Sequence, residues 1–153
     1  MSRPSVILAC LAALAALVFV GACGGSGEPG TVNTVELPGY GEVLATADDR
    51  PLYLLSSDPK NGTECTGECT KEFKPLIADG EPTAGDGVDE DRLGTFRRSD
   101  GGTQVLYNGH ALYTYERADA GMGAGAGVKH GKGTWYLVDP DGEAITATAV
   151  GGY

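Results

Sequence analysis

The chain has 153 residues, and its 21 acidic residues outnumber its 11 lysines and arginines, which gives a formal net charge of −10. Nucleic-acid binding depends on lysine and arginine contacts to phosphate, so we expect no nucleic-acid partner. An acidic surface maintains solubility and also suits a cationic partner. The chain contains 25 glycines, about twice the usual share of roughly 7 per cent, which predicts many tight turns.

The N-terminus has the layout of a secretory signal. Arg3 supplies a positive charge, and residues 6–20 contain no charged side chain, as in the apolar region of a signal peptide. A helix of about 15 residues spans roughly 22 Å, whereas the hydrocarbon core of a bilayer is about 30 Å thick. A membrane-spanning helix is therefore disfavoured, and we assign residues 1–22 to a signal peptide.

The cysteine that ends the sequence Val20-Gly21-Ala22-Cys23 follows this apolar run. The string resembles the lipobox of bacterial lipoprotein precursors, in which the cysteine is acylated and becomes the mature N-terminus. It predicts lipidation of Cys23, and attachment through that lipid to the extracytoplasmic face of a bacterial cell membrane. The alternative is an ordinary cleaved signal with a bystander cysteine. Cleavage removes one positive charge and no acidic residue, which changes the net charge from −10 to −11.

Composition then divides the rest of the chain. Residues 23–38 are rich in glycine, threonine and proline, which predicts a lipidated N-terminus followed by a flexible tether. Residues 39–153 have the length of a single domain.

Two cysteines stay in that domain, because Cys10 leaves with the signal and Cys23 carries the lipid. In an oxidising compartment the remaining pair, Cys65 and Cys69, predicts a disulfide. A redox-active or metal-binding role is the alternative. Three residues separate the two cysteines, instead of the two of thioredoxin-like motifs, and two thiols alone make an incomplete zinc site.

The first predicted elements of the domain are two short strands, residues 43–47 and 51–55, which form a hairpin around the polar turn 48–50. Residues 65–73 predict one short helical turn near the disulfide, with Thr70 as its N-terminal cap. Between the two halves of the domain, the acidic, glycine-containing segment 79–91 predicts an exposed loop.

The second half continues with a strand over residues 94–98, which joins a clearer hairpin. Its strands, 103–107 and 110–115, flank Asn108-Gly109, a pair that favours a type I′ turn because both central positions need positive φ. These three strands predict a meander.

The last elements are a glycine-rich segment and a third hairpin. Glycine alternates with other residues over 121–127, which we interpret as a mobile loop. The strands 135–138 and 143–145 turn on a Pro-Asp-Gly signal. Together, the elements predict an all-β fold of antiparallel hairpins.

The two halves are similar to each other. Residues 50–55 match residues 110–115 in their place after a hairpin turn. Each copy contains a tyrosine and a later aspartate, which are Tyr53 with Asp58 in the first copy and Tyr113 with Asp119 in the second. The domain therefore reads as two diverged repeats.

These residues resemble a family of secreted-repeat bacterial lipoproteins. Its motif is a tyrosine, any residue, an aromatic residue, two further residues and an aspartate. The resemblance implies an envelope protein, and most members of the family have no known function. Leu55 stands at the aromatic position of the first copy, and Asp119 is one residue late in the second. The resemblance covers residues 41–142 and rests on Val43-Leu44, Leu52-Tyr53, Cys65-Thr66-Gly67-Glu68-Cys69, Phe73-Lys74-Pro75-Leu76, residues 107–113 and Gly133-Thr134-Trp135-Tyr136.

The two tyrosine and aspartate pairs admit two interpretations. In the structural one, the aspartates cap turns through backbone N–H groups, and the tyrosine hydroxyls hydrogen-bond at the rim of the core. In the functional one, carboxylates and phenols at equivalent ends of two repeats form a ligand or cation site.

Metal and catalytic motifs are weak. His110 and His130 are the two histidines of the chain and have no fixed spacing; with carboxylates they are weak candidates for a transition-metal site. The sequence contains neither a Gly-x-Ser-x-Gly elbow nor a His-Glu-x-x-His motif. We therefore expect no catalytic residues and no cofactor. The function predicted is a lipid-anchored extracytoplasmic binding or structural module for an envelope protein or cationic partner, and the alternative is a metal-binding or redox accessory lipoprotein.

Overall fold

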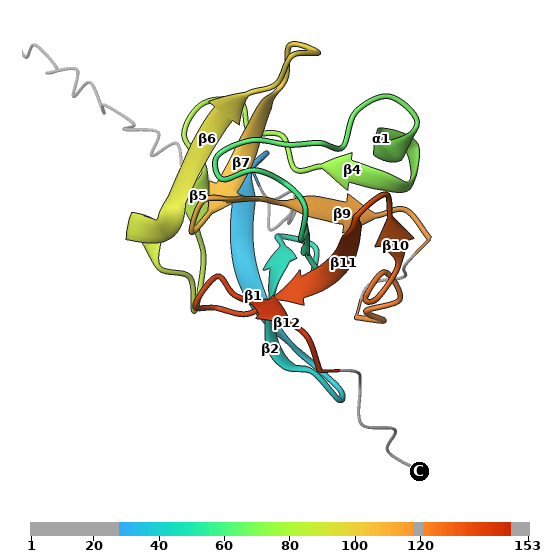
Figure 1. Cartoon of the computed structure of the whole chain (residues 1–153). Coiled ribbons are helices and arrows are strands. Elements are labelled where there is room, and N and C mark those ends of the chain that lie inside the picture. Colours follow the sequence, from blue (N-terminus) through green and yellow to red (C-terminus); the bar gives the residue numbers. More distant parts are fainter. Residues whose placement is uncertain (1–27, 118–120, 148–153) are drawn as a thin grey trace, which may run out of the picture.

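The computed structural model describes residues 28–117 and 121–147, so Cys23 and Asp119 lie outside the described residues. Strands dominate, as predicted, and the helical elements are short (Figure 1). In chain order the elements are β1 (Thr31–Leu37), β2 (Gly41–Thr46), β3 (Tyr53–Leu55), α1 (Cys69–Glu72), β4 (Phe73–Pro75), β5 (Thr83–Ala84), the 3-10 turn η1 (Glu90–Arg92), β6 (Leu93–Arg97), β7 (Thr103–Tyr107), β8 (His110–Ala111), β9 (Tyr113–Tyr115), β10 (Lys129–His130), β11 (Gly133–Val138) and β12 (Ala144–Ile145).

The strands form three sheets, with orders β2-β1-β5, β10-β11-β3-β9-β4 and β6-β7-β8, and β12 also pairs with β11. Every pair of strands is antiparallel except β1 with β5. Figure 1 shows β6 and β7 at one side of the molecule, β4 beside α1, and the β1–β2 hairpin reaching to the opposite end. The predicted antiparallel all-β class is confirmed.

The domain begins earlier than the composition predicted. Residues 31–37, which composition assigns to the tether 23–38, form strand β1, and residues 32–37 of it pair with β2. Val32 and Leu37 are fully buried. The boundary at residue 39 is therefore wrong. Threonine and valine, which favour a pleated strand, outweigh the neighbouring glycines and prolines.

The first predicted hairpin forms only near its turn. The amide of Thr46 donates to the carbonyl of Arg50 at 2.9 Å, Ala45 bridges Pro51, and the amide of Leu52 donates to the carbonyl of Leu44 at 2.8 Å. From Tyr53 on, the chain leaves β2, and β3 pairs with β11 and β9 instead. This placement in the middle of a sheet buries both faces of β3, which a two-stranded hairpin would not do.

The second hairpin is confirmed at its turn. Asn108 has φ 50° and Gly109 has φ 79°, as a type I′ turn requires. The strands β6, β7 and β8 form the predicted meander. The predicted strand 110–115 is interrupted after Ala111, because β9 crosses to the sheet of β3 and β4.

The third hairpin is also confirmed. Strands β11 and β12 pair, and the amide of Asp139 donates to the carbonyl of Glu143 at 3.0 Å. Gly142 has φ 85°, a conformation that glycine adopts without a steric penalty.

Two local predictions need correction. Thr70 lies inside α1 instead of capping it, and its hydroxyl donates to the carbonyl of Gly67 at 2.7 Å. The segment 79–91 is largely exposed, as predicted, yet it contains β5, which pairs in parallel with β1. The acidic segment is therefore attached to the domain at this point.

The register of the paired strands supports the interpretation of the domain as two diverged repeats. Tyr53 of β3 lies directly opposite Tyr113 of β9, so the corresponding strands of the two halves are neighbours. On its other side β3 pairs with β11, where Leu137 faces Tyr53; β9 pairs with β4, where Pro75 faces Tyr113. In the row β11-β3-β9-β4, the two central strands carry the corresponding tyrosines, and each pairs with one outer strand. The order is therefore equivalent when it is read from either end.

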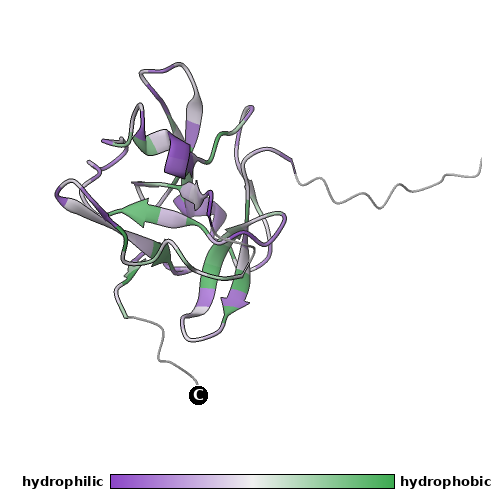
Figure 2. Cartoon of the chain, turned by 90° about the vertical axis from the view of Figure 1, so that its right-hand side faces the viewer, coloured by the Kyte–Doolittle hydropathy of each residue, from purple (hydrophilic) through white to green (hydrophobic). Residues whose placement is uncertain are grey.

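The interior contains two groups of buried side chains. We call the first the aromatic cluster; it consists of Tyr53, Phe73, Tyr113, Tyr115 and Trp135, whose rings contact one another. The Phe73 and Trp135 rings are stacked, with centroids 3.8 Å apart. The second group is mainly aliphatic and lies on the other face of the same strands. Figure 2 shows hydrophobic residues along the strands and hydrophilic residues on the loops and around α1.

Candidate functional site

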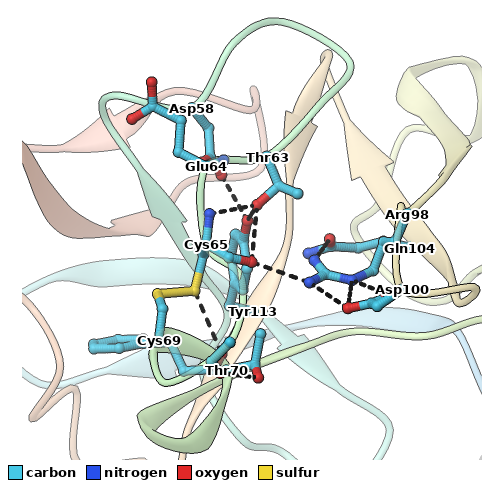
Figure 3. The surroundings of a disulfide bond; sticks show 12 residues. Asp58, Thr63, Glu64, Cys65, Cys69, Thr70, Arg98, Asp100, Gln104 and Tyr113 are labelled. Carbon is cyan, nitrogen blue, oxygen red and sulfur yellow. Dashed lines mark hydrogen bonds and ion pairs between the residues drawn. A yellow bond between two sulfur atoms is a disulfide. The ribbon is translucent and has the colours of Figure 1, made fainter.

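The structure joins the tyrosine of the second repeat to the aspartate of the first. The hydroxyl of Tyr113 donates to Oδ2 of Asp58 at 2.7 Å, and Oδ1 of Asp58 accepts from the amide of Glu64 at 2.7 Å (Figure 3). Asp58 therefore engages the tyrosine of the other repeat instead of Tyr53 of its own, and the second pair, Tyr113 with Asp119, lies partly outside the described residues. Because β3 and β9 are antiparallel neighbours, the loop that follows β3 passes the side chain of Tyr113.

Thr63 connects this pair to the disulfide loop. Its hydroxyl hydrogen-bonds to the hydroxyl of Tyr113 and accepts from the amide of Cys65 at 2.9 Å. In Figure 3 the side chains of Tyr113 and Thr63 point toward one another below Asp58. The segment from Asp58 to Cys65 is thus held against the core by a tyrosine from the other repeat.

The predicted disulfide between Cys65 and Cys69 is confirmed, with Cα atoms 5.3 Å apart. Cys65 is fully buried and Cys69 is 9 per cent exposed. The bond fastens the start of α1 to the loop that Asp58 and Thr63 hold in place. It also occupies the two thiols that a zinc site would have used.

Sequence reasoning missed a buried arginine in this network. The side chain of Arg98 is 2 per cent exposed, and it donates to the carbonyl of Cys65 at 3.0 Å and to Asp100 at 2.8 Å. It also donates to Gln104 at 2.7 Å, whose amide group donates to the carbonyl of Leu112 at 2.8 Å. The local spacing of Arg98 and Asp100 was a usable signal for the ion pair, whereas nothing in the sequence signalled the contact with Cys65.

The environment shifts the titration of these groups. Burial raises the pKa of Asp58 above its ordinary value, although the hydrogen bonds from Glu64 and Tyr113 oppose the shift. Burial and the nearby Asp58 carboxylate raise the pKa of Tyr113. The Arg98 guanidinium lowers the pKa of Asp100. Tyr113 therefore keeps its proton at neutral pH and acts as a hydrogen-bond donor.

The network is complete without a ligand. Among the described residues, every buried side-chain nitrogen and oxygen has a hydrogen-bond partner. Buried polar groups that are satisfied in this way rigidify a fold. The arrangement therefore supports the structural interpretation of Tyr113 and Asp58, and the ligand or cation site stays a prediction.

Tyr53 occupies the corresponding position in the first repeat and has a different partner. Its hydroxyl accepts from the amide of Gly125 at 3.2 Å. A Cβ atom at Gly125 would lie 3.0 Å from the rings of Tyr53 and Tyr115. Gly123 and Gly125 are buried, so this segment packs on the aromatic cluster, and its mobility stays a prediction. Burial raises the pKa of Tyr53 to about 12.

The two histidines lie in different sheets. His110 belongs to β8, next to the Asn108-Gly109 turn, and His130 belongs to β10. Over residues 28–117 and 121–147, no group of three histidine, cysteine, aspartate or glutamate side chains is placed to hold a metal ion. Within the same ranges, no helix has the length and apolar character needed to cross a membrane.

The comparison with protein families matches the second half of the chain. Residues 94–139 match a secreted repeat of unknown function. The matched segment covers most of β6 and all of β7 to β11, including Tyr113 and Trp135, and is shorter than the resemblance over 41–142. No curated protein and no solved structure matches the chain. Residues 94–139 are thus similar to a secreted repeat of unknown function, which suggests an extracellular or envelope location.

Proposed function

We propose that the protein is a lipid-anchored, non-catalytic module on the extracytoplasmic face of a bacterial cell membrane, where it binds or scaffolds another envelope component. The disulfide between Cys65 and Cys69 carries the proposal, because disulfides persist in oxidising compartments outside the cytoplasm. The match to a secreted repeat supports the same address. The lipobox-like residues 20–23 support attachment through Cys23.

The corrected start of the domain sharpens the anchoring. Strand β1 begins at Thr31, so only residues 24–30 separate it from Cys23. At roughly 3.3–3.6 Å per residue, a fully extended chain between these two points reaches about 28 Å. An acylated Cys23 would keep the domain close to the bilayer, where membrane proteins and other envelope components are the available partners.

The internal hydrogen bonding favours binding or scaffolding over catalysis. Tyr113 and Asp58 engage each other, Thr63 and the backbone. A general acid, base or nucleophile needs a free group within reach of a substrate. The excess of acidic residues suits a basic or neutral partner surface.

Metabolic labelling with an alkynyl fatty acid tests the anchor. We expect the wild-type chain to take up label and to sediment with membranes, and Cys23→Ala to lose both properties. Cys10→Ala is the matched control, because that cysteine lies inside the predicted signal, and it should behave as wild type. Unlabelled wild-type protein, or label retained by Cys23→Ala, would overturn the anchor.

In-cell crosslinking followed by mass spectrometry tests the binding role. We expect the same envelope component to be captured by the wild-type chain in independent experiments. A charge-reversed segment 79–91 should capture less of it if the partner is cationic. Capture that is equal with and without crosslinker would contradict a specific partner.

A further inference from the structure

A pocket of about 210 Å³ lies between the ends of β10 and β12, which both pair with β11. Residues of β11 line it from one side, the chain around β10 and β12 closes two others, and the tyrosine of the β1–β2 turn adds an aromatic wall. Among the residues that line the pocket are Tyr40, Ala126, Lys129, Thr134, Tyr136 and Ile145. The pocket is separate from the Tyr113 and Asp58 network.

Among the described residues that line the pocket, Lys129 is the one that carries a charge. Its ammonium group donates to the hydroxyl of Thr134 at 2.8 Å. Within the described ranges no carboxylate lies within ion-pair distance of it, which is also true of Lys60, Arg97 and Lys132 but not of the other lysines and arginines described there. Lys129 is exposed, its ammonium group is hydrogen-bonded at the pocket wall, and it keeps further donors for an anion.

The sequence around Lys129 is also positively charged. Residues 121–138 contain Lys129, His130 and Lys132 and no acidic residue, although the chain as a whole carries a net charge of −10. At physiological ionic strength exposed charges are largely screened beyond about 8 Å. The wall that carries Lys129 is thus locally basic, while Glu42 and Glu143 lie two residues from Tyr40 and Ile145 on the other walls.

Size and wall chemistry restrict the other part of the ligand. A cavity of roughly 150 Å³ is known to hold benzene, whereas drug-sized ligands need about 300–1,000 Å³. The pocket has room for one ring and a short polar group. Tyr40 and Tyr136 supply aromatic surface and Ile145 supplies aliphatic surface, and aromatic rings favour stacked or edge-on neighbours.

We propose that this pocket binds a small aromatic carboxylate, with the ring against Tyr40 and Tyr136 and the carboxylate on Lys129. The proposal rests on the binding role proposed above and names a ligand class for it. The pocket carries a lysine, whereas the chain as a whole is acidic. Binding of an anionic small molecule in the pocket is therefore compatible with binding of a cationic protein partner elsewhere on the surface.

Ligand-observed fluorine NMR tests the proposal with 4-fluorophenylacetate and its neutral counterpart 4-fluorophenylacetamide. The full chain is measured in phosphatidylcholine nanodiscs if it is acylated and in buffer if it is not. A failed lipidation test therefore leaves the binding test intact. Because a partly exposed ion pair contributes little, we expect the carboxylate to bind about threefold to fivefold more tightly than the amide.

Three variants locate the binding. Lys129→Met should remove the preference for the carboxylate, and the matched control Lys132→Met should keep it. Ala147→Trp places a large ring at the pocket wall and should weaken both ligands at least tenfold, with circular dichroism confirming an unchanged fold. Equal binding of the two probes to the wild type, or an unchanged preference in Lys129→Met, would overturn the proposal.

Discussion

Tyr53 and Tyr113 occupy corresponding positions in the two repeats, and they lie opposite each other on neighbouring strands. Both rings belong to the aromatic cluster and both are fully buried. Their hydroxyls differ: that of Tyr113 donates to the carboxylate of Asp58, whereas that of Tyr53 accepts from the backbone of Gly125. The repeats thus share a ring position and differ in how the hydroxyl is satisfied.

The loops that cover the two tyrosines explain this difference. Over Tyr113, the loop after β3 is fixed by the Cys65–Cys69 disulfide and by polar side chains. Over Tyr53, the segment before β10 comes close enough because Gly125 has no side chain. The first half covers the tyrosine of the second with a loop closed by a disulfide, and the second half covers the tyrosine of the first by glycine packing. The strands that the two repeats share therefore form the core, and the loops that differ between the repeats determine how each tyrosine is covered.

The largest expected effect comes from the stacked rings that the two halves contribute. Trp135 and Phe73 lie at corresponding positions, facing Leu55 and Tyr115 across the sheet. We expect Trp135→Ala and Phe73→Ala each to lower the free energy of unfolding by about 3–5 kcal/mol, because each leaves a large cavity. Guanidinium unfolding followed by far-ultraviolet circular dichroism measures both. A loss below about 1 kcal/mol in only one variant would show that the halves are not equivalent in the core.

The disulfide comes next in expected size. Replacing Cys65 and Cys69 together by alanine should cost about 2 kcal/mol, the loop-closure entropy of a ring of about five residues. Hydrogen exchange should become faster in the Asp58 to Cys69 region and stay unchanged near Gly125. Wild-type protein under reducing conditions is the control. Faster exchange over both loops would mean that the two closures are coupled.

The sequence was sufficient for the strand class and for the turns. The Asn108-Gly109 turn was predictable because positive φ restricts the residue types at both positions. The disulfide was predictable because the other two cysteines had assignments of their own. These predictions depend on local chemistry, which a single sequence displays.

Long-range pairing was less accessible. Strand β3 was expected to stay with β2, and it pairs with β9 and β11 instead. Sequence similarity placed Tyr53 and Tyr113 in equivalent positions, but it could not show that the hydroxyl of one reaches the aspartate of the other's repeat. Arg98 was missed for the same reason, because its partner Cys65 is far away in the sequence.

Removing the two hydroxyls separately compares the loops directly. Tyr113→Phe deprives Asp58 of a donor, and a hydrogen bond to a charged group contributes about 1.5–3 kcal/mol. Tyr53→Phe removes an acceptor from the Gly125 amide, and a neutral hydrogen bond contributes about 1 kcal/mol. We therefore expect the larger loss of stability in Tyr113→Phe. Thermal unfolding of both variants measures the difference, and equal losses would contradict a special role for Asp58.

The smallest expected effect is on the pH dependence of stability, and it separates two aspartates of the same network. Burial raises the pKa of Asp58, so protonation favours the folded state, and this contribution is lost as the pH rises through the raised pKa. Arg98 lowers the pKa of Asp100, so its contribution is present above the ordinary value and is lost as the pH falls through the lowered pKa.

Urea unfolding of the wild type, Asp58→Asn and Asp100→Asn across the acidic range measures both contributions. The difference between wild type and Asp58→Asn should favour the wild type less as the pH rises, and the difference for Asp100→Asn should favour it more. Carbon-13 NMR titration of the two carboxyl groups gives the order of the pKa values directly, with Asp58 above Asp100. If both stability differences changed with pH in the same direction, the hydrogen bonds from Glu64 and Tyr113 would outweigh the burial of Asp58. Both aspartates would then hold their loops as ionised carboxylates.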